Sequence, residues 1–438
     1  MPKILPSKKL DTAKIPAPLP EDFVKTMQAS LQSTREQHMV RGIEELEKLD
    51  SITALVDALV FKALEAGASD IHVDPQGEIL LIRFRIDGVL HDVLSLKKAF
   101  QPLVTTRIKV LAGLRTDEHL VPQDGRFGME DDDGNKVEIR VSIIPTFYGE
   151  NAVLRLLVGG THVIQLEDLG LSARDLALVH RYIYKPYGMI LATGPTGSGK
   201  TTTLYSVLRI LNTREVSIVT IEDPIEYAVD GITQLQVNPQ TGFTFASGLR
   251  SIVRQDPNIV MVGEIRDQET AGIAVNAAMT GHLLLSTLHT IDAATTLPRL
   301  LDMGIEPFLI ASTVNILIGQ RLVRKLCVDC RVSATLSAEE RMALSGSISE
   351  ERLRSLKQVW RPGGCDHCAH SGYTKRIGIY EVLEMSEKIR PLVMRRANAE
   401  EIRTVAREEG MTTMFDDGLQ KVMTGMTSLA ELIRVIKD

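Results

Sequence analysis

The sequence predicts an α/β protein in which a small α+β domain precedes a larger domain built on a parallel sheet. Residues 78–94 alternate between apolar and polar side chains, as expected of strands that are buried on one face only. After residue 159 the pattern changes to short apolar runs separated by longer helical stretches, which indicates a parallel sheet with helical crossovers. A glycine-rich segment at residues 194–201 follows the first of these runs, where a phosphate-binding loop is expected.

The composition is that of a folded protein. The 438 residues suffice for about two to four domains. They are 44% hydrophobic and 24% charged, which excludes general disorder and a collagen-like repeat. The net charge of −6 disfavours a protein coated with basic side chains that grip nucleic acid. The chain has no run of about 18 apolar residues, and its N-terminus lacks the apolar core of a secretory signal, so we expect a cytoplasmic protein.

The N-terminal part divides into a short segment and a domain. Residues 1–49 contain five prolines before Glu21 and then a helical pattern, and we expect an extended or helical segment there. The α+β domain spans residues 50–158, and an apolar repeat of three and four residues from Ile52 to Ala63 predicts its first helix. Asp87-Gly88 predicts the turn of one hairpin. A second strand pair is expected at Arg126–Met129 and Val137–Ile144, joined through the polar turn at residues 131–134.

The second domain contains four apolar runs that are too short for helices and have the density of strands buried on both faces. They are Met189–Thr193, Ser217–Ile221, Ile259–Val262 and Leu283–Thr287. We place the core of this domain at residues 159–326. A cysteine-containing module is expected at 327–376, and a helical region at 377–438 with breaks at Gly410 and Gly425.

Residues 194–201 match the phosphate-loop pattern G-x-x-x-x-G-K-[ST] between a strand and a helix. The glycines allow the backbone to turn successive N–H groups toward a phosphate, and the following helix adds its positive N-terminus. We expect Lys200 to reach the β- and γ-phosphates and Thr201 to bind Mg²⁺. An ordinary glycine-rich turn is the alternative. The predicted site for ATP and Mg²⁺ consists of Gly194, Pro195, Thr196, Gly197, Ser198, Gly199, Lys200, Thr201 and Thr202.

Carboxylates follow two of the predicted strands, at the edge where open α/β sheets bind their ligands. Glu222, Asp223 and Glu226 come after the second strand, and Glu264 comes after the third. Acids at this edge can hold Mg²⁺ or orient the attacking water. Without a phosphate loop upstream, each cluster would equally be an ordinary solvated turn.

Two histidines and two arginines complete the candidate set. His282 and His289 bracket the strand Leu283–Thr287, and we interpret both as sensors of the γ-phosphate or as groups that position water. A satisfied core or surface histidine is the alternative for each. Arg250 and Arg254 lie four residues apart on one predicted helix face, where they either approach the nucleotide or form a solvent-facing row of salt bridges.

Four motifs, GPTGSGKT, VTIEDPIEY, IVMVGEIRD and TGHLLLSTLHT, resemble the Walker A, aspartate-box, Walker B and histidine-box series of the bacterial type II secretion and type IV pilus assembly ATPases. The resemblance spans about residues 50–438. It implies a PAS-like N-terminal domain, a RecA-like P-loop ATPase domain and a cytoplasmic homohexamer. In that family, ATP hydrolysis drives the assembly of a pseudopilus or pilus.

The resemblance also assigns roles to individual residues. By motif match Glu264 is the essential Walker B glutamate, and Glu222, Asp223 and Glu226 are the aspartate-box acids, of which we assign Asp223 to Mg²⁺. His289 belongs to the histidine box. The arginines of the first domain, here Arg140 and Arg155, are candidates to meet the nucleotide when domains close or at a subunit boundary. Further candidates within the ATPase domain are Arg250, Arg254 and Arg266.

The four cysteines form two C-x-x-C pairs, Cys327 with Cys330 and Cys365 with Cys368. Each pair supplies two thiolates at the spacing of a zinc knuckle, and four thiolates complete a tetrahedral Zn²⁺ site. We therefore predict structural zinc, with a redox pair as the alternative and with His367 and His370 as substitute ligands. The resemblance also implies a tetracysteine motif, which separates secretion and pilus-extension motors from retraction motors.

A RecA-like nucleic-acid translocase is the alternative function, because residues 321–380 hold 11 Lys and Arg against 6 Asp and Glu. Aromatic residues make up 4% of the chain and offer little for single strands to stack on, so we expect no nucleic acid. The resemblance implies docking on inner-membrane platform proteins, which would make the protein peripheral to that membrane, with acidic phospholipid as a further contact. Residues 1–49 are too few for the docking domain of full-length secretion members, so we expect either a reduced docking helix at Glu21–Leu49 or docking that is supplied differently.

Overall fold

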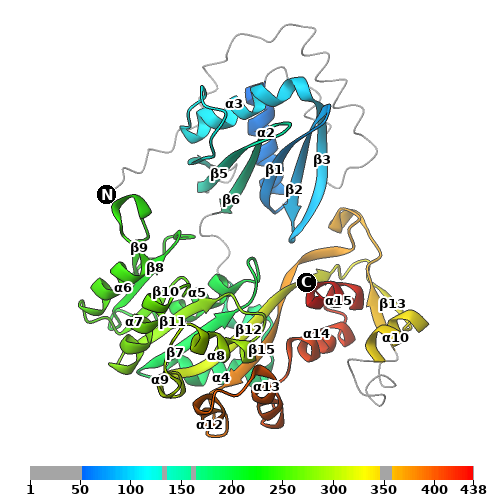
Figure 1. The fold of residues 1–438 in the computed structure, drawn as a ribbon. Coiled ribbons are helices and arrows are strands. Elements are labelled where there is room, and N and C mark those ends of the chain that lie inside the picture. Colours follow the sequence, from blue (N-terminus) through cyan, green and yellow to red (C-terminus); the bar gives the residue numbers. More distant parts are fainter. Residues whose placement is uncertain (1–51, 131–135, 159–163, 346–357, 438) are drawn as a thin grey trace. The chain divides into compact units, whose positions relative to one another are not determined.

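The computed structural model describes residues 52–130, 136–158, 164–345 and 358–437 (Figure 1). The predicted N-terminal segment 1–49, the turn at 131–134 and the glycine linker at 159–160 lie outside the described residues. The chain divides into two compact units, each with a sheet of its own. We describe each unit by itself.

The first unit is a six-stranded antiparallel sheet in the order β3-β2-β1-β6-β5-β4, with two helices on one face. Its helices are α2 (Ile52–Glu65) and α3 (Gln101–Ala112). Its strands are β1 (Ala68–Gln76), β2 (Ile79–Ile86), β3 (Val89–Lys97), β4 (Gln123–Glu130), β5 (Lys136–Thr146) and β6 (Gly149–Val158). A short 3₁₀ turn, Lys98–Phe100, leads into α3.

Alternation along the strands explains how this unit folds. Leu80, Ile82 and Phe84 on β2 point to the helices and are fully buried, whereas Arg83 and Arg85 lie on the opposite face of the sheet. The predicted hairpin is confirmed, since Asp87 and Gly88 both have positive φ, as a two-residue turn of this kind requires. The second predicted strand pair is confirmed as β4 and β5.

The second unit contains a seven-stranded sheet in the order β15-β12-β7-β11-β10-β8-β9. All neighbouring strands are parallel except β12 and β15. The strands are β7 (Gly188–Thr193), β8 (Ile218–Glu222), β9 (Thr233–Gln236), β10 (Ile259–Val262), β11 (Leu283–Leu288), β12 (Val314–Leu326) and β15 (Tyr373–Glu384). The four predicted strands are confirmed as β7, β8, β10 and β11, each to within one residue at either end.

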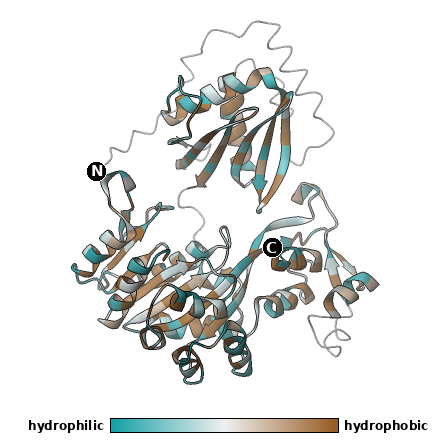
Figure 2. Ribbon diagram, viewed as in Figure 1, coloured by the Kyte–Doolittle hydropathy of each residue, from teal (hydrophilic) through white to brown (hydrophobic). Residues whose placement is uncertain are grey.

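Helices cover both faces of this sheet, so its central strands are buried throughout and mostly apolar (Figure 2). On β10, Val260 and Val262 join the core on one face, while Ile259 and Met261 join the core on the other. These helices are α4 (Ala173–Ile183), α5 (Lys200–Leu211), α6 (Phe245–Val253), α7 (Gln268–Met279), α8 (Ala293–Asp302) and α9 (Pro307–Thr313). Helix α4 precedes β7, and the others lie between the strands from β7 to β12, with α8 and α9 consecutive before β12.

The C-terminal part adds a two-stranded sheet and further helices. The small sheet pairs β13 (Val332–Ala334) with β14 (Val359–Arg361). The helices are α10 (Ala338–Ser345), α12 (Ile389–Met394), α13 (Ala399–Glu408), α14 (Met414–Met423) and α15 (Leu429–Lys437). Gly410 and Gly425 interrupt the helices with positive φ, as predicted.

The prediction of a helical region from residue 377 is wrong at its start. Residues 377–384 belong to β15, which pairs with β12 along its whole length. Tertiary packing accounts for the difference, because β12 offers this segment an edge on which apolar residues such as Ile379 and Val382 become fully buried.

None of the helices that the structure describes is both long and apolar enough to cross a membrane.

Candidate active site

The phosphate-loop motif forms the connection between β7 and α5. Gly194, Gly197 and Gly199 adopt φ of +145°, +77° and +89°, which side chains other than glycine rarely tolerate. A Cβ at Gly194 would lie 2.3 Å from the backbone oxygen of Gln320. Helix α5 starts at Lys200 without a side-chain cap, so the N–H groups of its first turn remain directed at the loop.

Polar groups inside the loop fit a bound phosphate. The Nζ of Lys200 donates to the carbonyl oxygens of Gly194 and Pro195, at 2.8 Å and 3.0 Å, and so lies across the loop. Burial lowers the pKa of Lys200 to about 8, while the charge of Glu264 partly opposes this shift. The Ser198 hydroxyl is buried and has no hydrogen-bond partner among the described residues. Thr201 and Thr202 are half-buried in the first turn of α5.

Glu264 lies just beyond the end of β10, with one donor on each carboxylate oxygen. Arg266 approaches Oε1 at 2.5 Å, and the Nε2 of His289 lies 3.0 Å from Oε2. His289 follows β11, the neighbour of β10 in the sheet, so two strand ends bring these side chains together. Glu264 is 9% exposed, whereas His289 and Arg266 are largely exposed. The Walker B and histidine-box segments thus meet in a direct contact between Glu264 and His289.

Thr290 ties the His289 segment to the phosphate loop, a link that the sequence did not reveal. The Thr193 hydroxyl, at the end of β7, donates to the carbonyl oxygen of Thr290 at 3.0 Å and accepts from its N–H at 3.2 Å. Thr193 directly precedes Gly194. The ends of β7, β10 and β11 therefore form one continuous polar edge.

Glu222 is placed differently from the expectation of an acid that acts on ATP. Its side chain is 2% exposed, and its carboxylate accepts hydrogen bonds from Tyr205, Thr220 and Gln234. Burial raises its pKa, and these three donors oppose the rise. The carboxylate thus braces β8 against α5. Asp223 is exposed and Glu226 is half-buried in the segment that follows.

The interpretation of His282 as a phosphate sensor is wrong. His282 precedes β11, and its Nδ1–H donates to the carbonyl oxygen of Ala277 at 2.9 Å. The seven residue steps from His282 to His289 span about 23 Å in an extended strand. The two histidines therefore lie at opposite edges of the sheet, and only His289 reaches the edge that carries the phosphate loop.

Arg250 and Arg254 lie at the C-terminal end of α6, and both are exposed. Arg250 pairs with Glu269 in the first turn of α7, and Arg254 donates to the Ser251 hydroxyl at 3.2 Å. Within this one chain these contacts match the salt-bridge alternative rather than a contact with the phosphate loop.

Arg140 and Arg155 belong to the first unit. They face each other in register on β5 and β6, and Arg126 on β4 continues the row. Arg155 donates to Asp70 at 2.9 Å. This row lies on the sheet face opposite α2 and α3.

The four cysteines gather at one point. Their sulfur atoms all lie within 4.8 Å of one another, and none of the four forms a disulfide. Zn–S bonds of about 2.3 Å in a tetrahedron place sulfurs about 3.8 Å apart. Cys365 and Cys368 are separated by 3.7 Å, too far for a disulfide and close to that spacing. The Cys330 sulfur accepts from the N–H of Gly364 at 3.2 Å, as a zinc-bound thiolate does. The donor set therefore fits Zn²⁺.

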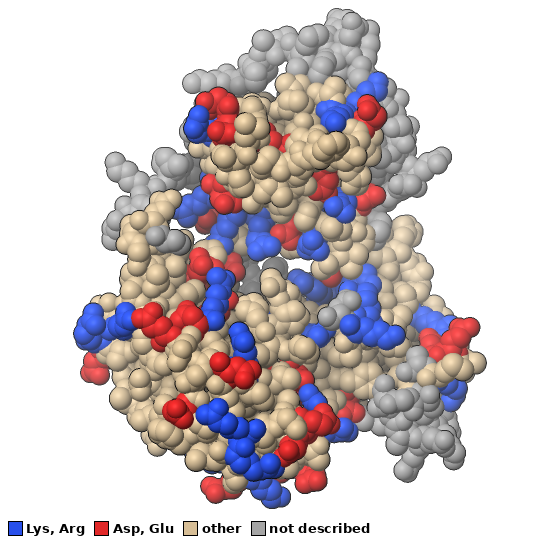
Figure 3. All heavy atoms as spheres, in the orientation of Figure 1, with Lys and Arg blue, Asp and Glu red and all other residues tan. Residues whose placement is uncertain are grey.

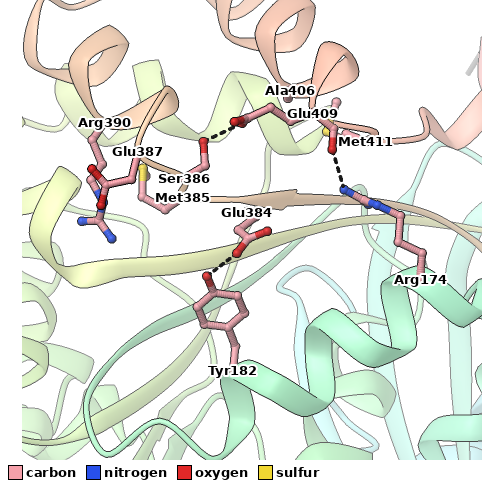
Figure 4. Close-up of a pocket in the computed structure, with 10 residues that line it drawn as sticks. All are labelled: Arg174, Tyr182, Glu384, Met385, Ser386, Glu387, Arg390, Ala406, Glu409 and Met411. Carbon is pink, nitrogen blue, oxygen red and sulfur yellow. Dashed lines mark hydrogen bonds between the residues drawn. The ribbon is translucent and has the colours of Figure 1, made fainter.

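A cavity of about 470 Å³ lies elsewhere in the second unit, between α4, the end of β15 and α12 and α13 (Figure 4). Its polar groups bond to one another. Tyr182 donates to Glu384 at 2.7 Å, and Ser386 donates to Glu409 at 2.5 Å. None of the predicted site residues lines this cavity.

Charge on the face shown in Figure 3 is mixed, with acidic and basic side chains interspersed over both units. Many of these side chains pair with one another, as Arg395 does with Glu401 and Arg361 with Glu340. This pattern does not favour the nucleic-acid alternative, which calls for a coherent basic surface.

Comparisons with known proteins agree with this geometry. Residues 45–434 match the family model described as Type II/IV secretion system protein. The Type II secretion system ATPase E of Vibrio cholerae is 46% identical over 387 residues, covering 88% of this chain and 76% of that protein. The Type IV pilus assembly ATPase PilB of Myxococcus xanthus is 41% identical over 416 residues, covering 94% and 73%.

A solved structure supports the architecture. The ATPase DotB of Legionella pneumophila superposes with a TM-score of 0.65 at 22% identity, over 88% of this chain and 96% of that one. In chain order, the parallel strands β7, β8, β10, β11 and β12 stand in the sheet as 5-1-4-3-2, a RecA-like arrangement. The phosphate loop, the Glu264–His289 pair, the cysteine cluster and these similarities lead to one conclusion: the chain belongs to the type II/IV secretion system protein family and is a secretion or pilus assembly ATPase.

Proposed function

We propose that ATP binds at the phosphate loop Gly194–Thr201 and is hydrolysed beside Glu264. The observation that carries this proposal is the Glu264 carboxylate, held by His289 and Arg266 at the sheet edge that also carries the phosphate loop. Phosphoryl transfer is catalysed mainly by positioning and by charge stabilisation, and this edge offers both.

Different side chains of the site bind the phosphates, activate the water and hold Mg²⁺. Lys200 and the N–H groups of the loop and of the first α5 turn bind the phosphates. Glu264 orients the attacking water and receives its proton, and His289 fixes the carboxylate through the 3.0 Å contact at Oε2. Thr201 and Asp223 would hold Mg²⁺, which neutralises charge on the phosphates when bound. Glu226 remains a candidate acid of the same edge, while Glu222 acts through Tyr205 by positioning α5.

The arginines are proposed to act when surfaces come together. Arg140, which is half-buried, and Arg155, which is exposed, face each other on the first unit, and a guanidinium that reaches a nucleotide only on closure would couple hydrolysis to movement. Arg250 and Arg254 are exposed on α6 and are candidates to reach the nucleotide of a neighbouring subunit.

The assembly and its setting are also proposals. The similarity to secretion and pilus ATPases supports a homohexamer that works in the cytoplasm, attached to inner-membrane platform proteins and aided by acidic phospholipid. We propose a PAS-like domain at residues 50–158, an ATPase core at 159–326 and a zinc module at 327–376, in which Cys327, Cys330, Cys365 and Cys368 hold structural zinc.

Steady-state phosphate release from the purified full-length protein tests the site. Lys200→Ala should abolish nucleotide binding and turnover. Glu264→Gln should keep nucleotide binding and lose turnover by at least about 100-fold. Lys185→Ala, an exposed lysine next to Tyr182, serves as the matched control and should behave as the wild type. Unchanged turnover in Lys200→Ala would rule out the phosphate loop as the active site. Stimulation by DNA instead of acidic vesicles would favour the translocase.

A further inference from the structure

Strand β12 runs past the phosphate loop. Gly319 on β12 pairs with Thr193, the last residue of β7, so the next residue along β12, Gln320, lies beside the loop itself. Gln320 is fully buried in the second unit. Burying an amide is unfavourable unless its N–H and C=O groups are both hydrogen-bonded. The buried Gln320 side chain therefore needs a partner for each of these groups.

Both ends of this amide are bonded, and both bonds reach the phosphate-binding segment. Nε2 of Gln320 donates to the carbonyl oxygen of Ser198 at 2.8 Å, and Oε1 accepts from the Thr203 hydroxyl at 2.9 Å. The orientation of the amide is unambiguous, because the Ser198 oxygen can only accept and must face the NH₂ group. Gln320 therefore connects the loop to the first turn of α5.

The bond to Ser198 fixes the direction of an N–H group. The carbonyl of Ser198 and the N–H of Gly199 belong to one planar trans peptide, so they point to opposite sides. With the Ser198 oxygen held on the Gln320 side, the Gly199 N–H is directed away from β12. In phosphate loops, N–H groups of this stretch are the ones that contact the phosphates.

The phosphate loop packs so closely against position 320 that few side chains other than glutamine fit there. A Cβ at Gly199 would approach Nε2 of Gln320 to 3.1 Å, and a Cβ at Gly194 would strike its backbone oxygen. The absence of a side chain at Gly194 and at Gly199 thus permits β12 to lie close against the loop. Asparagine is too short by one methylene to make both bonds, and a carboxylate would face the Ser198 oxygen with repulsion.

We propose that Gln320 is a positioning residue of the ATPase, which aims the Gly199 N–H at the phosphates by holding the Ser198 carbonyl, with Thr203 orienting its amide. The proposal rests on the proposed function of the phosphate loop. Because the N–H in question binds phosphate in the ground state and in the transition state alike, its loss acts on binding rather than on the chemical step.

Gln320→Met tests this, since methionine keeps the length and removes both hydrogen bonds. We expect the KM for ATP and the Kd for ADP to rise about 10- to 100-fold while kcat stays within about threefold. Gln320→Glu keeps the acceptor for Thr203 and places a carboxylate against the Ser198 oxygen, and it should raise both constants at least as much. Thr203→Val should give a smaller rise, and no further rise in the Gln320→Met background, because both residues act through one amide.

Asn315→Leu is the matched control. Asn315 lies on the same strand, and its amide donates to the carbonyl oxygen of Tyr187 at 3.0 Å, at the end of β12 far from the loop. It should lower the melting temperature without changing KM. If Gln320→Met and Thr203→Val leave KM and Kd unchanged, or change them only as Asn315→Leu does, Gln320 is a structural residue and the proposal is wrong. If Lys200→Ala retains ATP turnover, the proposed site itself fails instead.

Discussion

Replacing Glu381 by glutamine should change how the stability of the second unit depends on pH. Glu381 lies on β15 and is 3% exposed, and its carboxylate accepts the N–H of Ala293 at 3.2 Å. Burial, the largest cause, and the charge of Asp292 together raise its pKa to a net value of about 7. The N–H groups of Ala293 and Met414 and the charge of Arg403 oppose the shift.

The sign and size of the effect follow from this shift. In the unfolded chain Glu381 should titrate near its ordinary value of 4.5, below its value in the folded protein. The folded state therefore binds the proton more tightly, and the contribution is present at low pH and lost as the pH rises through about 7. Between pH 5 and pH 8 the wild type should lose about 2 to 3 kcal/mol that the Glu381→Gln protein does not lose.

Urea unfolding at several pH values measures this difference. The single tryptophan, Trp360, packs against Gly425 in the second unit and reports on the unfolding of that region by fluorescence. Glu387→Gln, an exposed glutamate on the same stretch of chain, should follow the wild-type curve. A constant difference in unfolding free energy between wild type and Glu381→Gln at all pH values would refute the reasoning.

Three further outcomes are expected. Gly194→Ala should lose ATP binding, because its Cβ would lie 2.3 Å from the Gln320 oxygen at a φ of +145°, and retained binding by calorimetry would contradict the tight fit of β12. Glu222→Gln should lower the melting temperature but reduce kcat/KM less than about tenfold, whereas an equal loss to that of Glu264→Gln would show that this buried carboxylate takes part in the reaction. Metal analysis of reduced protein should find about one zinc per chain, falling with Cys365→Ser, and a value near zero in the wild type would exclude the site.

Local pattern was enough to predict the central strands and the loop between them. β7, β8, β10 and β11 are buried on both faces, so each is a short apolar run that stands out from the polar helices around it. The phosphate loop requires glycine at defined positions for backbone reasons, which makes it visible in the sequence.

Strand β12 was harder to predict because distant residues satisfy its charges. β12 carries Arg321 and Arg324 inside a buried strand. Their partners are the carbonyl oxygen of Val435 and the carboxylate of Glu431, more than 100 positions further along the chain. A sequence pattern compares only neighbouring residues, so it cannot reveal partners this far along the chain. The same limit concealed Gln320, whose two bonds go to residues 117 and 122 positions away.

The two histidines differ in which end of strand β11 they flank: His282 precedes the strand and His289 follows it. Both His282 and His289 flank the same apolar run, and composition alone treats them equally. Only the rule that ligands bind at the carboxyl ends of parallel strands distinguishes them, and it favours His289. No comparable rule predicts that the Glu222 side chain is buried, because its orientation depends on where Tyr205 and Gln234 lie in three dimensions.

Strand β12 also provides a fixed reference distance for measuring movements within the molecule. It is hydrogen-bonded to β15 over most of its length and to β7 over Val314–Gly319, so stretching or bending it would break a ladder. Asn315 and Lys325 are ten residues apart on it, which corresponds to about 33 Å. Paramagnetic labels at these two positions should report this fixed separation in every nucleotide state. A third label in the first unit could then be located against that known baseline, so that movement of the unit is distinguished from movement of a label.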